Sequence, residues 1–153
     1  MFCSYERRRR HADHLEKGKL ALRICRTLTV HATVEQEIFY PAVAAVLDAE
    51  AADLLGQANI EHGGIEGLVS KVEDTPADDP LFDSMIEVLA TYVARHVTME
   101  EEKIFSWVRH SRLDLLGTGE RLVARRLELS TARLGRQLVR QARKVMGRKR
   151  SPG

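Results

Sequence analysis

The sequence predicts an all-α protein built as one bundle of antiparallel helices. Apolar residues recur at steps of three and four along most of the chain, which is the spacing of one helix face. Only 4 prolines and 10 glycines interrupt the 153 residues, and the alternating pattern typical of strands is absent. Hydrophobic residues make up 44% and charged residues 30%, a composition that suits one domain with a substantial core.

The first long helix is expected from about Glu16 to Leu47. Before it, the segment 2–10 is either the end of a helix or a basic arm. Pro41 should kink the long helix or end its first part, because proline lacks the N–H that a helix interior uses. The expected buried face of this helix carries Leu20, Ile24, Leu28, His31, Glu35 and Ile38.

A second helix is expected over about Ala51–Val72 and a third from Pro80 to about His110, with a loop at 73–80 between them. Asp79 before Pro80 is typical of a helix N-cap followed by the first helical residue. The inner face of the second helix carries Leu55, Ala58, His62, Ile65 and Val69. That of the third carries Phe82, Met85, Leu89, Val93, His96, Glu100, Ile104 and Trp107.

The C-terminal part differs in charge from the rest. After a loop near 116–119, residues 121–153 hold 11 Lys and Arg against one acid, Glu128, whereas the remainder has 13 basic and 21 acidic residues. We therefore divide the chain into a helical bundle, 1–120, and a basic amphipathic helix with its tail, 121–153, disordered from Gly147 onward. This helix could bind nucleic acid or anionic lipid, but it lacks aromatic residues and any DNA-reading motif. We favour a solvated, arginine-rich helix that packs its leucines on the bundle.

No stretch approaches the roughly 20 apolar residues of a membrane span, so no membrane association is expected. No apolar region follows the basic residues near Met1, which argues against a secretory signal. Cys3 and Cys25 form neither a CxxC motif nor a zinc-like group. We interpret them as reduced thiols of a cytoplasmic protein.

Each of the three long helices carries a histidine followed four residues later by a glutamate. The pairs are His31 and Glu35, His62 and Glu66, and His96 and Glu100. This spacing puts both side chains on one helix face, a turn apart. Each histidine could be a core residue hydrogen-bonded to the glutamate of the next turn. However, an unpaired carboxylate in a core costs on the order of several kcal/mol, so three of them favour a metal site.

Imidazole and carboxylate ligands without thiolate suit iron, manganese or zinc, and bridging carboxylates favour a pair of iron ions. The order of the residues, with histidine first, excludes the Glu-x-x-His motif of ferritin-like bundles. It also excludes the His-Glu-x-x-His helix of metalloproteases.

Three segments closely resemble the bacterial hemerythrin-like (HHE cation-binding) family. They are 31–42 (HATVEQEIFYPA), the pair Glu61-His62, and 96–105 (HVTMEEEKIF). The resemblance covers about Leu20 to Leu129. It implies an up-and-down four-helix bundle around a non-haem di-iron site with an oxo or hydroxo bridge. Members of the family bind oxygen, sense oxygen or iron, or respond to nitric oxide and peroxide.

The resemblance also implies the ligands of the metal site. By position, the terminal iron ligands are His31, His62 and His96, and the bridging carboxylates are Glu35 and Glu100. Glu101 is the alternative to Glu100, and Glu66 is a possible further ligand because related proteins place a second histidine there.

The chain departs from the family pattern in its first helix. Members carry another ligand histidine there, in an Asp-His pair well upstream, and Asp13-His14 lies too close to the first motif for a helix, a reversal and a return. We expect the N-terminal segment to be the latter half of that helix, without its histidine and with His11 and His14 in the following loop. One iron would then be under-ligated, unless a partner chain or the C-terminal helix compensates. Gln36 and Ser106 replace an acid and a proline that are common in the family.

These observations predict a cytoplasmic non-haem iron protein that binds oxygen or another small diatomic molecule, or senses oxygen, iron or redox stress. We favour a binding or sensing role over an enzymatic one. A di-iron peroxidase or oxidase ranks last, because the sequence shows no substrate pocket. The alternative is a metal-free bundle that acts as an interaction module through its basic C-terminal helix. The assembly state, monomer or homo-oligomer, stays open.

Overall fold

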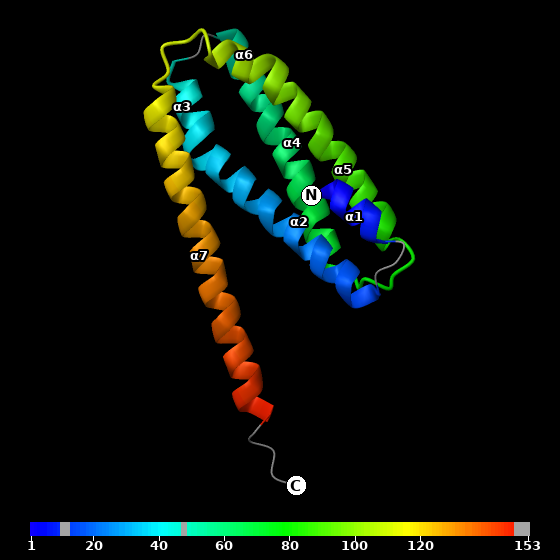
Figure 1. Cartoon of the computed structure of the whole chain (residues 1–153). Helices are drawn as coiled ribbons and strands as arrows, with labels where there is room; N and C mark the ends of the chain where they lie inside the picture. Colours follow the sequence, from blue (N-terminus) through cyan, green and yellow to red (C-terminus); the bar gives the residue numbers. More distant parts are fainter. Residues whose placement is uncertain (10–12, 47–48, 149–153) are drawn as a thin grey trace.

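The computed structural model describes residues 1–9, 13–46 and 49–148, and every regular element within them is helical. The α-helices are α1 (Phe2–Arg9), α2 (His14–Val34), α3 (Tyr40–Ala44), α4 (Ala49–Asp74), α5 (Phe82–Met99), α6 (Phe105–Val108) and α7 (Leu115–Arg148). Two π-helical segments, η1 (Glu35–Phe39) and η2 (Glu100–Ile104), join α2 to α3 and α5 to α6. The predicted all-α fold is confirmed (Figure 1).

Three long helical runs form the body of the bundle: α2 with η1 and α3, then α4, then α5 with η2 and α6 (Figure 1). The middle run, α4, packs against both α2 and α5, while α1 packs on α2. The last helix, α7, packs on α2 and η1, and its C-terminal half continues past the bundle (Figure 1). One continuous helix therefore crosses residue 120, and the division of the chain at that point stays a prediction.

The short helix α1 is held by polar contacts as well as by packing. Tyr5 is 1% exposed, and its hydroxyl donates to Oδ1 of Asp83 at 2.6 Å. Lys17 donates to Oδ2 of the same carboxylate at 2.8 Å, and Arg9 pairs with Glu87 on α5. The segment 2–9 is thus a docked helix that joins α2 to α5, not a free arm.

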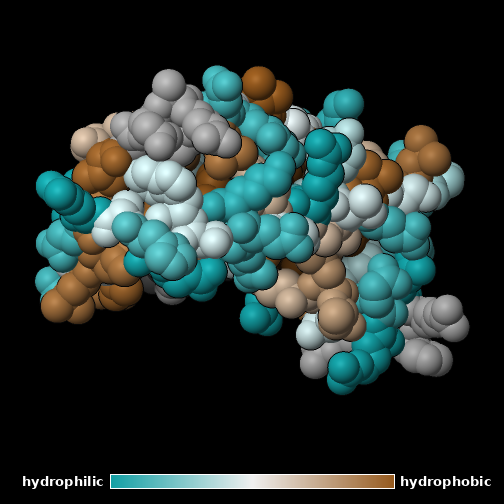
Figure 2. Space-filling model, turned by 90° about the horizontal axis from the view of Figure 1, so that it is seen from above, coloured by the Kyte–Doolittle hydropathy of each residue, from teal (hydrophilic) through white to brown (hydrophobic). Residues whose placement is uncertain are grey.

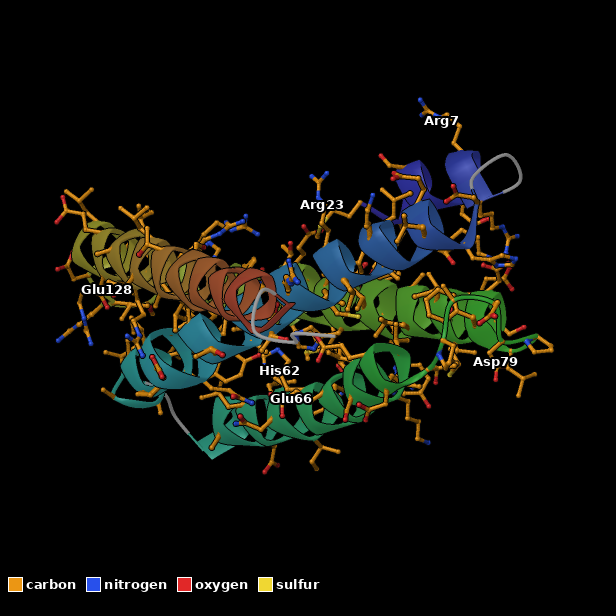
Figure 3. The ribbon with its side chains drawn as sticks, turned by 90° about the horizontal axis from the view of Figure 1, so that it is seen from below. Arg7, Arg23, His62, Glu66, Asp79 and Glu128 are labelled. Atoms are coloured by element: carbon orange, nitrogen blue, oxygen red, sulfur yellow. The ribbon has the colours of Figure 1, made fainter. Side chains whose placement is uncertain are left out.

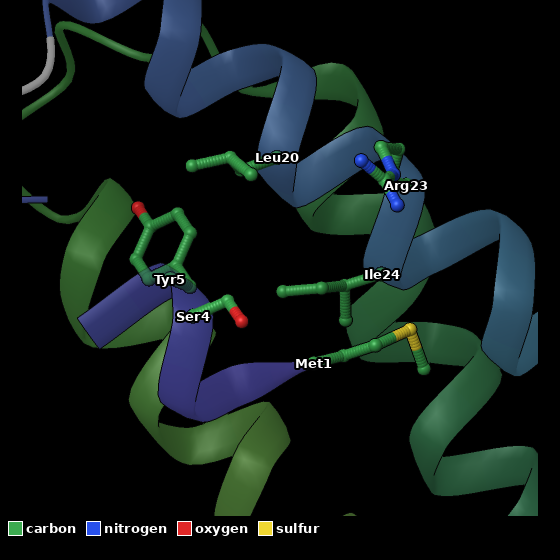
Figure 4. A pocket seen from close by; sticks show the side chains of 6 residues that line it. All are labelled: Met1, Ser4, Tyr5, Leu20, Arg23 and Ile24. Atoms are coloured by element: carbon green, nitrogen blue, oxygen red, sulfur yellow. The ribbon is translucent and has the colours of Figure 1, made fainter. Parts of the chain in front are cut away.

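A cavity of about 230 Å³ lies between α1 and α2 (Figure 4). It is lined by Met1, which precedes α1, by Ser4 and Tyr5 from α1, and by Leu20, Arg23 and Ile24 from α2. None of these residues belongs to the predicted metal-binding set.

Several predicted boundaries need correction. The helical run continues past Pro41, which lies in α3 directly after the π-helical segment η1, and it ends at Ala44 rather than near Leu47. The third long helix begins at Phe82 rather than Pro80, and Asp79 accepts the N–H of Leu81 from the preceding turn. His14 was expected in a loop but is the first residue of α2, where the Asp13 side chain caps the helix by accepting the N–H of Glu16.

The C-terminal helix also differs from the expectation. It begins at Leu115, so no loop occupies 116–119, and it extends through Gly147 to Arg148. Residues 149–153, which complete the predicted disordered tail, lie outside the described residues, as does His11.

Two apolar clusters fill the interior, one toward each end of the bundle. The first contains Tyr5, Ala21, Ile24, Cys25, Leu28, Ile65, Val69, Val72, Phe82, Ile86 and Leu89. The second contains Phe39, Tyr40, Val43, Leu55, Ala58, Met99, Ile104 and Val108. Along each long run, the predicted histidine ligand (His31, His62 or His96) falls between the residues of the two clusters. The fold therefore places the candidate site in the middle of the bundle, with apolar side chains on both sides.

None of the helices in the described part of the chain is both long and apolar enough to span a bilayer. On the face seen in Figure 2, hydrophobic residues are interspersed with hydrophilic ones.

Candidate metal centre

The two expected bridging glutamates occupy equivalent backbone positions. Glu35 is the first residue of η1 and Glu100 is the first residue of η2. The backbone N–H of Tyr40 donates to the carbonyl of Glu35, and that of Phe105 donates to the carbonyl of Glu100, so each turn closes over five residues instead of four. Such π-helical turns inside α-helices are frequent at functional sites.

Each glutamate lies beside the histidine one turn before it. Oε2 of Glu35 is 3.3 Å from Nε2 of His31, and Oε2 of Glu100 is 3.5 Å from Nε2 of His96. The predicted pairing of imidazole and carboxylate on one helix face therefore holds in both runs.

The third histidine joins these two pairs from α4. Figure 3 shows His62 on this helix. The residue is 1% exposed. Its Nε2 lies 2.9 Å from Nε2 of His96 and 3.3 Å from Oε2 of Glu35. One ligand atom from each of Glu35, His62, His96 and Glu100 lies within 4.8 Å of all the others, and all four residues are buried. We call this set the four-residue cluster.

The donor set of the four-residue cluster fits a metal ion. In a tetrahedral site, nitrogen and oxygen ligands about 2.0–2.2 Å from one ion are separated from one another by roughly 3.3–3.6 Å. Two imidazole–carboxylate distances in the cluster, 3.3 Å from His62 to Glu35 and 3.5 Å from His96 to Glu100, match this separation. Moreover, Oε2 of Glu35 and Nδ1 of His62 are buried without a hydrogen-bond partner. The Glu35 oxygen lies near two imidazole nitrogens without a hydrogen bond to either. A cation bound among these three atoms would supply the missing partner.

Burial controls the charges of these side chains in the absence of a cation. It raises the pKa of Glu35 to about 8, and it raises the pKa of Glu100 with a further contribution from the Glu35 carboxylate. It lowers the pKa of His62, and it lowers the pKa of His31 to about 4, reinforced by the positive charges of the neighbouring histidines and of Arg126. Without a cation, burial therefore favours the neutral forms of Glu35, Glu100, His31 and His62, and a cation bound between the carboxyl groups competes with their protons.

His31 is the most exposed of the three predicted histidine ligands. Its side chain is 43% exposed, against 2% for His62 and His96. It reaches the four-residue cluster through Glu35, whose Oε2 lies 3.3 Å from both His31 and His62. Glu35 is thus the carboxylate that stands between the two imidazoles.

The two lower-ranked candidates lie outside the cluster. Glu66 is exposed, and its Oε1 accepts a long hydrogen bond of 3.4 Å from Gln36. Glu101, the alternative to Glu100, is exposed as well.

Sequence reasoning missed a tyrosine beside the cluster. Tyr40 is 4% exposed; its hydroxyl donates to Oε1 of Glu100 at 2.8 Å and lies 3.4 Å from Nε2 of His62. Its ring stacks on the His62 ring with centroids 5.4 Å apart. Burial and the Glu100 carboxylate raise the pKa of the phenol above its ordinary value, so it remains a hydrogen-bond donor. Tyr40 lies five residues after Glu35, which is the spacing that the π-turn closes and not an α-helical one.

A second missed residue is Glu61, whose Oε2 lies 3.1 Å from Nδ1 of His96. The sequence shows it only as the neighbour of His62, and adjacent helical residues point in different directions. Its contact with α5 depends on how α4 and α5 pack.

Comparison with known families agrees with this geometry. Residues 4–108 match the family described as hemerythrin HHE cation binding domain. Neither the curated proteins nor the solved structures give a match. The match spans α1 to α6, which carry the whole four-residue cluster, and it ends before α7. A matched segment of this length, together with the buried imidazole and carboxylate groups, shows that the chain belongs to the hemerythrin HHE cation-binding family.

Proposed function

We propose that this protein holds non-haem iron, as a pair of ions, and uses it to bind oxygen or to sense oxygen, iron or redox stress in the cytoplasm. The observation that carries the proposal is the four-residue cluster, in which two imidazoles and two carboxylates from three helical runs converge in the interior. Nitrogen and oxygen ligands without thiolate are compatible with iron. Both cysteines are unpaired, which agrees with a reducing compartment.

The chain's own residues divide into distinct roles in this proposal. His62, His96, Glu35 and Glu100 supply buried ligands, and His31 supplies a further nitrogen beside Glu35. Tyr40 orients Glu100 by its hydrogen bond, and the two apolar clusters exclude water from both ends of the site. Iron bound there would supply a redox-active centre for a diatomic ligand, and the half-exposed His31 marks the side from which that ligand could enter.

A second candidate function rests on α7. This helix lies beyond the family match and exposes Leu116, Val123 and Leu127 among basic residues. A bundle that carries no metal and binds a partner through α7 remains the alternative, with nucleic acid the less favoured partner.

Thermal unfolding with and without a strong chelator separates the two candidates. An ion that binds only the folded protein at 100 times its Kd stabilises it by about 2.7 kcal/mol, which raises Tm by roughly 5–11 °C for a chain of this size. We expect Fe²⁺ added anaerobically to raise Tm by this amount and the chelator to reverse it. A Tm that is indifferent to both would favour the interaction module.

A further inference from the structure

The two buried histidines of the cluster, His62 and His96, differ in the contacts of Nδ1, the ring nitrogen that points away from the cluster. Nε2 of His96 faces the cluster, 2.9 Å from His62 and 3.5 Å from Glu100, while its Nδ1 lies 3.1 Å from Oε2 of Glu61. Nδ1 of His62 is buried without a partner. Only one of the two rings is therefore fixed from both sides.

The contact with Glu61 also fixes the tautomer of His96. A neutral imidazole has one N–H and one lone pair, and a carboxylate oxygen can only accept a hydrogen bond. Nδ1 of His96 must therefore carry the hydrogen, which leaves the lone pair on Nε2, the atom that faces the cluster. Carboxylates that hold metal-binding histidines in this way orient the ring and raise its basicity.

Glu61 is itself held in place. Gln57, one turn earlier on α4, donates to Oε1 of Glu61 at 3.2 Å, and Nε of Arg95 on α5 lies 3.6 Å from the same oxygen. Its side chain is 16% exposed, so solvent competes little for the carboxylate. The chain Gln57–Glu61–His96 thus crosses from α4 to α5 directly behind the site.

We propose that Glu61 is a positioning residue that fixes His96, so that Nε2 presents its lone pair to the metal. This inference rests on the proposed function, because it assigns a role in metal binding. His96 is then the preset ligand. Nδ1 of His62 has no acceptor that would hold the hydrogen there. His62 must therefore adjust its tautomer when its Nε2 binds the ion.

The matched pair Glu61→Leu and Glu61→Gln tests the inference. Both replacements keep a side chain of similar size, but only glutamine retains an oxygen that can accept the hydrogen of Nδ1. We expect Glu61→Leu to weaken Co²⁺ and Fe²⁺ binding by about 10- to 100-fold, measured by competition with a chelator of known affinity. Glu61→Gln should recover most of the loss. Glu73→Leu, the same change at an exposed position of α4, should bind as the wild type does.

The tautomer of His96 provides a readout that does not depend on metal. In the metal-free protein, long-range ¹H–¹⁵N spectra of the imidazoles should show hydrogen on Nδ1 of His96 in the wild type and in Glu61→Gln. Glu61→Leu should show a mixture of tautomers. Unchanged metal affinity in Glu61→Leu, or an unchanged tautomer, would overturn the inference while leaving the proposed function intact. A wild-type protein that binds neither Co²⁺ nor Fe²⁺ would instead contradict the proposed function, and with it the ligand role of His96.

Discussion

Glu35 and Glu100 each open a π-helical segment, and each lies beside a histidine four residues earlier in the chain. The two halves of the site are therefore built by the same local device on two different helical runs. A proline after the glutamate is not required for it. Pro41 follows Glu35 by six residues, but Ser106, which has an N–H, holds the corresponding position after Glu100.

The difference in burial between His31 and His96 predicts unequal effects of their removal. His96→Ala should abolish metal binding, because it deletes a buried ligand of the four-residue cluster. His31→Ala should remove only the ion that His31 helps to hold, lowering the metal content from about two per chain toward one. Elemental analysis of both variants, purified in parallel, checks this. Equal losses in the two variants would contradict the unequal roles given to the two histidines.

Tyr40→Phe should lower stability without changing the shape of the core. The substitution keeps the ring that stacks on His62 but removes the donor to the buried Glu100. We expect a loss on the order of 1 kcal/mol in the metal-free protein, seen as a Tm lower by roughly 2–4 °C. A Tm equal to that of the wild type would mean that Glu100 finds another partner.

The stability of the metal-free protein should fall as the pH rises from 6.5 to 8. Burial raises the pKa of Glu35 from 4.5 to about 8, so between these values the folded state keeps a proton that the unfolded state releases, and stability decreases with pH. Burial lowers the pKa of His31 from 6.5 to about 4, which has the opposite sign but acts only below pH 6.5. Above pH 6.5 the carboxyl effect stands alone.

Thermal melts of chelated protein across this range measure the effect. Glu35→Gln removes the titrating group at nearly constant size and should flatten the decline between pH 6.5 and 8. A decline of the same steepness in this variant would assign it to other groups.

Arg125 should control how α7 docks on the bundle. Its guanidinium donates two hydrogen bonds to Glu37 on η1, from Nε at 2.7 Å and from Nη2 at 3.2 Å. Arg125→Glu places like charges together, and we expect faster amide hydrogen exchange in residues 115–132 while α4 and α5 exchange as before. The double variant Arg125→Glu with Glu37→Arg should restore slow exchange. If Arg125→Glu leaves exchange in α7 unchanged, apolar packing alone holds the helix.

Periodicity was sufficient to predict the long helices and the inward direction of His62 and His96. His96 and Glu100 come together because four residues make about one helical turn, a local relationship that the sequence displays directly. The loop predicted at 73–80 follows from equally local chemistry, although α4 ends at Asp74 and α5 begins at Phe82, two residues later than expected.

Other features depend on tertiary packing and were not predictable in this way. The π-turns at Glu35 and Glu100 could not be predicted from a proline, because Pro41 follows only the first of them. Glu66 has the same spacing from His62 as the other two glutamates have from their histidines, yet it is exposed, because α4 contributes a single residue to the centre. Glu61 reaches His96 only because α4 and α5 pack side by side.

The most direct test of the account is the metal content of anaerobically purified protein, determined by elemental analysis and followed by an optical spectrum after exposure to air. We expect about two irons per chain and the near-ultraviolet absorption of a bridged pair. A folded, helical protein that contains no metal and takes up none when Fe²⁺ is added would contradict it.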